Sequence, residues 1–364
     1  MNWIIYVIGL TVSCVLAVIL TPLVKKFAVW FGAIDVPNHR SVHTRIMPRM
    51  GGLAIFLAFV ATFFIISPAL NDFDTHVVLG LILGGAIIVF VGALDDKYNL
   101  SPKIKLAGQL AAAGVVIAFG MQIDYIKLPF GDAIDLNSWI SIPITIFWIV
   151  GVTNAINLID GLDGLSAGVS AIATSAILVL AIMMGNLTVI VISLILLGSI
   201  VGFLFYNFHP AKIFMGDSGS LFLGFSLATL SILGFKSATI VSFLVPLAIL
   251  GVPISDTLMA IIRRKLNKKP IFTADKGHLH HCLMGLGFSM RKTVLIIYGI
   301  SLAFGLCAVL LTKASQWGAI VIVVVLLLVM EVGAEAIGII SKSRKPVLRL
   351  LRRLLPASVR RTSK

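Results

Sequence analysis

The sequence predicts an all-α, polytopic membrane protein with about eleven transmembrane helices, and three observations lead to this fold class. Of the 364 residues, 59% are hydrophobic and only 12% are charged. The mean hydropathy of +1.07 lies far outside the range of soluble domains. The apolar residues form long runs, and the basic residues collect in alternate gaps between these runs.

Each predicted helix follows from the length of an apolar run. A helix that spans a bilayer needs about 20 predominantly apolar residues. Segments of about this length cover residues 3–22, 50–70, 76–94, 103–121, 139–158, 164–184, 188–206, 219–235, 238–260, 293–311 and 316–338.

The distribution of Lys and Arg predicts the orientation, because short loops rich in these residues stay in the cytoplasm. With the N-terminus outside, only Lys127, Lys236 and Lys313 of the 29 basic residues face outward. The basic C-terminal tail then lies in the cytoplasm, which requires an odd number of helices. We therefore predict an external N-terminus, a cytoplasmic C-terminus, a transmembrane domain of residues 1–340 and a basic cytoplasmic tail of residues 341–364.

The charge pattern predicts the kind of partner, and the spacing of the cysteines shows which cysteine sites to expect. The Leu/Arg alternation of the tail fits a helix on anionic lipid headgroups, so we expect membrane lipids and no nucleic acid as partners. The cysteines Cys14, Cys282 and Cys307 are scattered along the chain. Their spacing gives neither a disulfide framework nor a paired metal-binding motif.

Acidic residues gather at the predicted cytoplasmic helix ends, against the basic charge of that face. Carboxylates at the edge of the hydrocarbon are unfavourable unless they are paired or bind a metal, so they are candidates for function. These residues are Asp35, Asp95, Asp96, Asp160, Asp163, Asp217, Asp256 and Asp275.

Asp217 is the strongest single candidate for a metal ligand. It lies in the sequence Gly-Asp-Ser-Gly-Ser at the start of a predicted helix, where backbone N–H groups can meet a pyrophosphate. Asn154 and Asn157 share one helix face, and the amide oxygen of Asn157 can bind a metal. The alternatives are that Asp217 is only a helix N-cap and that the asparagines only satisfy backbone groups at a helix end.

Several cytoplasmic segments together resemble the signature regions of one enzyme family. They are residues 35–52, 94–96, 154–168, 209–224 and 262–289. In these segments the chain is similar to the bacterial polyprenyl-phosphate N-acetylhexosamine-1-phosphate transferases. The similarity is greatest to the branch that makes undecaprenyl-pyrophosphoryl-N-acetylglucosamine, which is related to the muramyl-pentapeptide transferases.

The resemblance implies a reaction and a location. N-acetylglucosamine-1-phosphate would pass from UDP-N-acetylglucosamine to undecaprenyl phosphate with release of UMP. The cofactor would be Mg²⁺, with Mn²⁺ as a substitute. The enzyme would lie in the bacterial cytoplasmic membrane with its active site facing the cytoplasm, and relatives suggest a homodimer.

Phosphoryl transfer between two anionic substrates needs a divalent cation and basic side chains. We expect Asp217 and Asn157 to bind the metal. Neighbouring helical residues diverge by about 100°, so Asp95 and Asp96 should have different roles. We expect Asp95 near the acceptor phosphate and Asp96 holding Lys105. Direct attack of the acceptor phosphate is the preferred mechanism, and a covalent aspartyl-phosphate route stays open.

The remaining candidates are predicted substrate contacts. By resemblance, Asp163 contacts uridine, and the loop at residues 275–289 contacts the sugar or its phosphate. For each basic residue the alternative is contact with lipid headgroups, and for the HLHH segment it is a zinc site that includes Cys282. The predicted substrate contacts are Lys105, Asn154, Asp160, Asp163, His43, Arg45, Arg49, Arg264, His278, His280 and His281.

A transporter or lipid flippase is the second class of function. Such proteins place carboxylates near the middle of the bilayer. Asp256 lies about seven residues before a basic run, and hence roughly 10 Å deep in a helix. Because the other carboxylates cluster at one face, we prefer the transferase interpretation.

Overall fold

The computed structural model describes residues 3–37, 46–70, 74–127, 133–235, 244–268, 270, 275, 277–339 and 348–349. Within these ranges the chain is predominantly helical. The helices are α1 (Trp3–Phe31), α2 (Gly51–Ile66), α3 (Thr75–Tyr98), α4 (Pro102–Ala118), α5 (Ser138–Ile159), α6 (Leu165–Met184), α7 (Leu187–Asn207), α8 (Gly216–Phe235), α9 (Leu244–Ile249), α10 (Gly251–Leu266), α11 (Leu279–Gly285), α12 (Met290–Lys313) and α13 (Gln316–Ile337). Two short antiparallel pairs join β1 (Ile34–Asp35) to β2 (Met47–Pro48) and β3 (Tyr125–Lys127) to β4 (Ala133–Asp135).

The prediction of an all-α, polytopic membrane protein is confirmed. Nine helices in the described ranges are long and apolar enough to cross a membrane, and each overlaps a predicted span. The predicted fourth span corresponds to α4, which has 17 residues. The total of eleven spans and the sidedness of the two termini stay predictions.

The predicted ninth span, residues 238–260, is wrong as a single helix. Residues 238–243 lie outside the described ranges, and the rest is divided between α9 and α10. Proline has no N–H, so Pro253 cannot donate to the carbonyl of Ile249, where α9 ends. The helical bonds resume with Ile254, whose N–H donates to the carbonyl of Leu250 at 3.0 Å.

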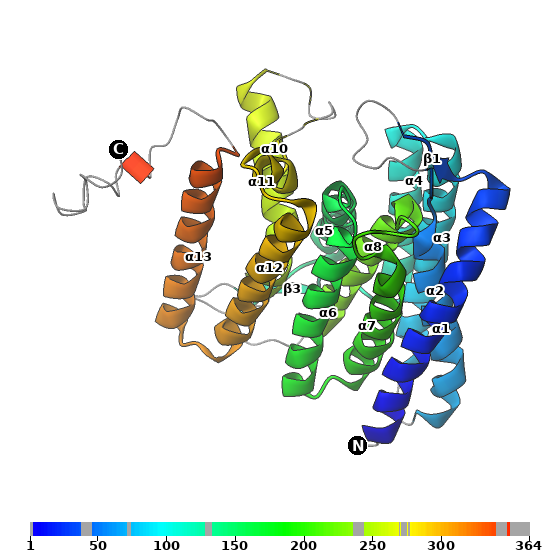
Figure 1. Ribbon diagram of the computed structural model, residues 1–364. Helices are drawn as coiled ribbons and strands as arrows, with labels where there is room; N and C mark the ends of the chain where they lie inside the picture. Colours follow the sequence, from blue (N-terminus) through cyan, green and yellow to red (C-terminus); the bar gives the residue numbers. More distant parts are fainter. Residues whose placement is uncertain are drawn as a thin grey trace.

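The bundle brings several helix ends together (Figure 1). Helices α5 to α8 form the middle, with α1 to α4 on one side and α12 and α13 on the other. Helix α1 begins at one end of the bundle, and α10 and α11 stand at the opposite end. The last turns of α3 and α5 and the first turns of α4 and α8 also lie at this second end, where the predicted site residues are concentrated.

Candidate active site

The N-terminus of α8 lies at the centre of the site, and glycines allow it to approach its neighbours. Gly216 begins α8 with a φ of +72°, in the left-handed region that favours glycine. A Cβ atom at Gly92 of α3 would lie 2.5 Å from the Cα of Ser218. A Cβ atom at Gly52 of α2 would lie 1.9 Å from the Cα of Gly219. Helices α2 and α3 therefore pack against α8 with backbone directly on backbone.

Asp96 caps α8 from the neighbouring helix α3. Its Oδ1 accepts a hydrogen bond from the N–H of Asp217 at 2.7 Å, and its Oδ2 accepts one from Ser218 at 3.2 Å. The first N–H groups of a helix have no partner within the helix, and negative charge is favourable there. The prediction that Asp96 holds Lys105 is therefore wrong, because the free N–H groups of α8 bind this carboxylate instead.

Lys105 lies between two other carboxylates. Its Nζ is 3.1 Å from Oδ2 of Asp95 and also contacts Oδ2 of Asp217. The lysine belongs to the first turn of α4, Asp95 to the last turn of α3, and Asp217 to the first turn of α8. Three helix ends thus meet in one ion-pair group, which we name the Asp95–Lys105–Asp217 cluster. Adjacent Asp95 and Asp96 have different partners, as their divergence on a helix requires.

Helix α5 adds two amides beside this cluster. Asn157 donates from Nδ2 to Oγ of Ser220 at 2.8 Å, and its side chain lies close to the carboxylate of Asp217. Asn154 donates from Nδ2 to Oε1 of Gln109 at 2.7 Å, and Gln109 returns a bond to Oδ1 of Asn154 at 3.3 Å. Asn154 therefore joins α5 to α4, and its contact with substrate stays a prediction.

Asp160 follows the last residue of α5, beside the cluster. Burial, and then the negative charges of Asp217 and Asp96, raise the pKa of Asp160 well above its usual range, although Arg49 opposes this effect. Arg49 also pairs with Asp35 across β1 and β2, at 3.0 Å from Nη2 to Oδ2. A protonated carboxyl at Asp160 can donate a hydrogen bond, which suits an anionic substrate oxygen.

Asp163 joins the turn after α5 to the loop between α7 and α8. Its Oδ2 accepts from the N–H of Ala211 at 3.1 Å and lies 2.8 Å from Nδ1 of His209. The buried Asn207 adds a second link, because its Oδ1 accepts from the N–H of Gly164 at 3.1 Å. These bonds fix the turn at residues 160–164 next to the start of α8.

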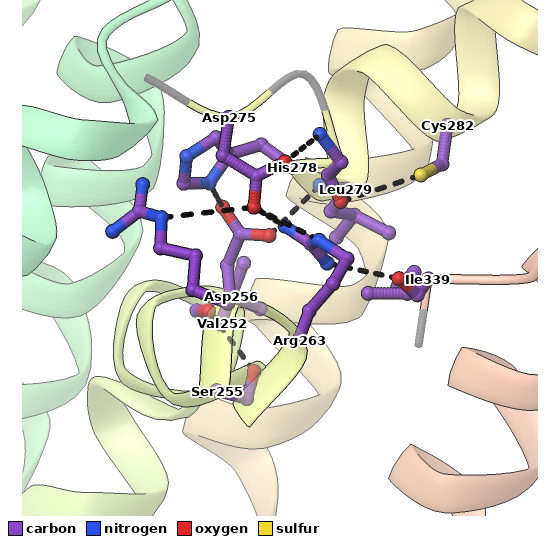
Figure 2. A network of polar contacts seen from close by, with 11 residues as sticks. Val252, Ser255, Asp256, Arg263, Asp275, His278, Leu279, Cys282 and Ile339 are labelled. Atoms are coloured by element: carbon purple, nitrogen blue, oxygen red, sulfur yellow. Dashed lines mark hydrogen bonds and ion pairs between the residues drawn. The ribbon is translucent and has the colours of Figure 1, made fainter. Parts of the chain in front are cut away.

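The loop before α11 is held by α10 (Figure 2). Asp256 accepts a hydrogen bond at Oδ1 from the N–H of Leu279, and its Oδ2 lies close to Nδ1 of His278, both at 2.8 Å. Two turns further along α10, Arg263 donates from Nε to Oδ2 of Asp275 at 2.8 Å. Burial raises the pKa of Asp275, but hydrogen bonds from Arg263 and a backbone N–H outweigh this and lower it.

Of the other predicted residues near this loop, His280 lies against the turn after α5. A Cβ atom at Gly161 would lie 2.6 Å from Nε2 of His280. The ring centroids of His280 and His281 are 4.2 Å apart. Burial, and then the neighbouring His281, lower the pKa of His280 to about 4. Arg264 approaches Asp275, with Nε 3.9 Å from Oδ2.

The structure shows which residues Asp256 contacts, whereas its depth in a bilayer stays a prediction. Counting back from the basic run suggested a carboxylate near the middle of the bilayer. Because α10 begins at Gly251, Asp256 lies in its second turn and contacts the loop residues His278 and Leu279. The carboxylate that most resembled a transporter site therefore binds a loop of the candidate active site.

Several residues that join the site were not singled out from the sequence. Asn207 and His209 carry a recognisable signal, because both are polar and lie between an apolar helix and the Gly-Asp-Ser-Gly-Ser motif. Ser220 is the last residue of that motif and carries the same signal, whereas Gln109 in an apolar helix gives none. The predicted contacts His43 and Arg45 lie outside the described residues.

The donor atoms around the Asp95–Lys105–Asp217 cluster fit Mg²⁺. Two carboxylates and the nearby amide of Asn157 surround a point that already holds a cation, the ammonium of Lys105. Mg²⁺ prefers oxygen ligands and often takes only one or two carboxylates, with water and substrate phosphates completing its shell. Among the described residues no three His, Cys, Asp or Glu side chains form a metal-binding group. The fold and the site thus define a multi-pass membrane protein with a charged centre suited to phosphate and a divalent cation.

Known proteins are similar in sequence to this chain over most of its length. The family described as glycosyl transferase family 4 matches residues 78–235. The probable undecaprenyl-phosphate N-acetylglucosaminyl 1-phosphate transferase of Bacillus subtilis is 46% identical over 350 residues, which cover 96% of this chain and 97% of the relative. The decaprenyl-phosphate N-acetylglucosaminephosphotransferase of Mycobacterium tuberculosis is 37% identical, with 86% of each chain covered.

A second branch is also similar. The phospho-N-acetylmuramoyl-pentapeptide-transferase of Geobacillus kaustophilus is 34% identical over 322 residues, which cover 83% of this chain and 96% of the relative. The chain belongs to glycosyl transferase family 4. It is more similar to the two N-acetylglucosamine relatives than to this muramoyl relative, which agrees with the branch that the sequence segments resemble.

Proposed function

We propose that the protein transfers N-acetylglucosamine-1-phosphate from UDP-N-acetylglucosamine to undecaprenyl phosphate. The products are undecaprenyl-pyrophosphoryl-N-acetylglucosamine and UMP. The names of its relatives support this reaction. The observation that carries it is the meeting of Asp95, Lys105 and Asp217 at the start of α8, where an anionic substrate would meet the ammonium group of Lys105.

The transfer is a displacement at the β-phosphorus of the donor. An oxygen of the acceptor phosphate forms the new bond to this phosphorus, and the bond to the oxygen of UMP breaks. Lys105 is the cation that can move from the carboxylates to a substrate phosphate, since an ammonium group binds phosphate as a point charge. Asp95 orients this lysine, and Asp96 fixes α8 so that Asp217 keeps its position.

Asp217 and Asn157 are the residues that would hold Mg²⁺. The ion would neutralise charge on the phosphates during transfer. The turn with Asp160 and Asp163 would bind the nucleotide, and the loop with Arg264 and the histidines would bind the sugar and its phosphate. The active site would face the cytoplasm in a bacterial cytoplasmic membrane, because the basic residues predict that sidedness.

The purified protein with both substrates and Mg²⁺ tests this function. We expect UMP in solution and a lipid whose mass equals undecaprenyl phosphate plus one N-acetylglucosamine-1-phosphate unit. The control omits undecaprenyl phosphate and should release no UMP. UMP release without a lipid product would instead indicate a hydrolase, and it would contradict the proposal.

A further inference from the structure

Asp256 uses both of its carboxylate oxygens on one short stretch of the loop that precedes α11. Oδ2 faces Nδ1 of His278, and Oδ1 accepts from the N–H of Leu279 (Figure 2). The side chains are deeply buried, with Asp256 at 5% and His278 at 6% exposure. Buried charges are unfavourable unless they are fully paired, so this contact is a strong constraint on the loop.

The contact also determines the chemistry of the His278 ring. When Asp256 is ionised, its carboxylate only accepts hydrogen bonds, so the proton in this contact lies on Nδ1 of His278. The second nitrogen, Nε2, is then the one left for a ligand. In metal sites, carboxylates that bind the far nitrogen of a histidine fix its tautomer and ring orientation in the same way.

The contact between Asp256 and His278 also affects the position of His280, which packs on the turn after α5. The rings of His278 and His280 lie nearly parallel, at 9° with centroids 6.1 Å apart. His280 in turn packs on Gly161, next to Asp160. A shift of His278 would therefore also move His280 away from Gly161.

Helix α10 holds the loop at two points. Asp256 and Arg263 are seven residues apart, so they lie on one face of the helix, two turns from each other. Arg263 binds Asp275 and also donates from Nη1 to the carbonyl of Ile339 at 2.9 Å. The loop is thus fixed to α10 on both sides of Gly277, and Ile339, two residues after the end of α13, supports the second point.

We propose that Asp256 is a positioning residue for the donor sugar-phosphate, acting through His278. This inference rests on the proposed function, in which His278 contacts the donor. Asp256 fixes the tautomer of His278 and the start of α11, and it has no direct role at the Asp95–Lys105–Asp217 cluster. Its loss should weaken binding of UDP-N-acetylglucosamine and leave binding of undecaprenyl phosphate unchanged.

The test compares Asp256→Asn, His278→Ala and the double variant in steady-state assays that vary each substrate. Asp256→Asn keeps an oxygen for Leu279 but removes the acceptor that keeps the proton on Nδ1. We expect the KM for the donor to rise about tenfold, in line with other supporting carboxylates, and the KM for the acceptor to change less than twofold. The double variant should be no worse than His278→Ala. Ser255→Ala, on the same helix, is the matched control and should behave as the wild type.

Different outcomes separate this inference from the proposed function. An inactive wild type overturns both. An active wild type with an unchanged donor KM in Asp256→Asn overturns the inference alone, as do independent, multiplying effects in the double variant. If Asp256→Asn does not fold, Asp256→Glu carries the same test, because it keeps the charge and moves it by one methylene.

Discussion

The carboxylate of Asp96 accepts a hydrogen bond from the backbone N–H of Asp217 at 2.7 Å, and this bond ties the last turn of α3 to the first turn of α8. A second bond, from Ser218, uses the other oxygen. The helix that carries the proposed metal ligand is therefore capped by a residue from another helix. Stability and the geometry of the site are coupled through this one side chain.

Asp96→Ala should destabilise the protein because it leaves buried N–H groups at the start of α8 without an acceptor. We expect a loss of about 1–3 kcal/mol in the free energy of unfolding, measured as a lower midpoint in thermal unfolding. Asp74→Ala is the matched control, since Asp74 caps α3 at an exposed position by accepting from Val77. An equal effect of the two substitutions would show that Asp96 does not hold α8.

Gly52→Ala should also destabilise the site, because a Cβ atom at this position overlaps Gly219 of α8. Backbone on both sides leaves no flexible side chain to move, so α2 and α8 must separate. Gly114→Ala is the control, since a Cβ atom there meets nothing within 4 Å. We expect a lower unfolding temperature and lower transferase activity for Gly52→Ala only. Wild-type stability of Gly52→Ala would contradict the close packing of these helices.

Lys105→Ala should make the stability of the protein more dependent on Mg²⁺. Without the lysine, Asp95 and Asp217 would face each other with no cation between them, and like charges at short distance repel. In a chelator, the unfolding temperature of Lys105→Ala should fall below that of the wild type, and added Mg²⁺ should raise it more than in the wild type. Lys103→Ala changes an exposed lysine in the same turn and serves as control. An equal Mg²⁺ response in all three proteins would refute the shared cation position.

The lowered pKa of His280 predicts that the protein loses stability in acid. Burial, and then His281, lower its pKa in the folded protein to about 4, whereas an unfolded histidine titrates near 6.5. Between these values the unfolded state binds more protons, so the unfolding free energy decreases as pH falls, by about 2 kcal/mol at pH 5.

His280→Gln should remove most of this acid sensitivity, and thermal unfolding at pH 5 and pH 7.5 measures it. His76→Gln is the control, because His76 is exposed and lies against Phe119, away from the loop. If His280→Gln kept the full difference between the two pH values, His280 would not be the group responsible.

The sequence was sufficient to predict the helices and most of the charged residues at the site, because both follow from the unfavourable transfer of polar groups into hydrocarbon. It was not sufficient to predict which charges pair. Asp96 and Lys105 are near neighbours along the chain, yet Asp96 binds the start of α8, 121 residues away from it. Such partners depend on which helix termini meet in space, and the spacing within one segment carries no information about that.

The break between α9 and α10 explains a second difference. The continuous apolar run of residues 238–260 predicts one helix, although Pro253 indicates an interruption of that helix. On the separate helix α10, Asp256 and Arg263 both contact the segment that leads into α11. The role of Asp256 therefore followed from tertiary contacts only.

Exchange of labelled UMP into nucleotide sugars tests the central claim most directly, because it needs only this protein, undecaprenyl phosphate and Mg²⁺. We predict exchange into UDP-N-acetylglucosamine and none into UDP-muramyl-pentapeptide. Asp217→Asn should unfold within a few degrees of the wild-type midpoint. It should nevertheless reduce exchange more than about a hundredfold, since it removes one charged metal ligand. Exchange into the pentapeptide donor alone, or undiminished exchange by Asp217→Asn, would contradict the account.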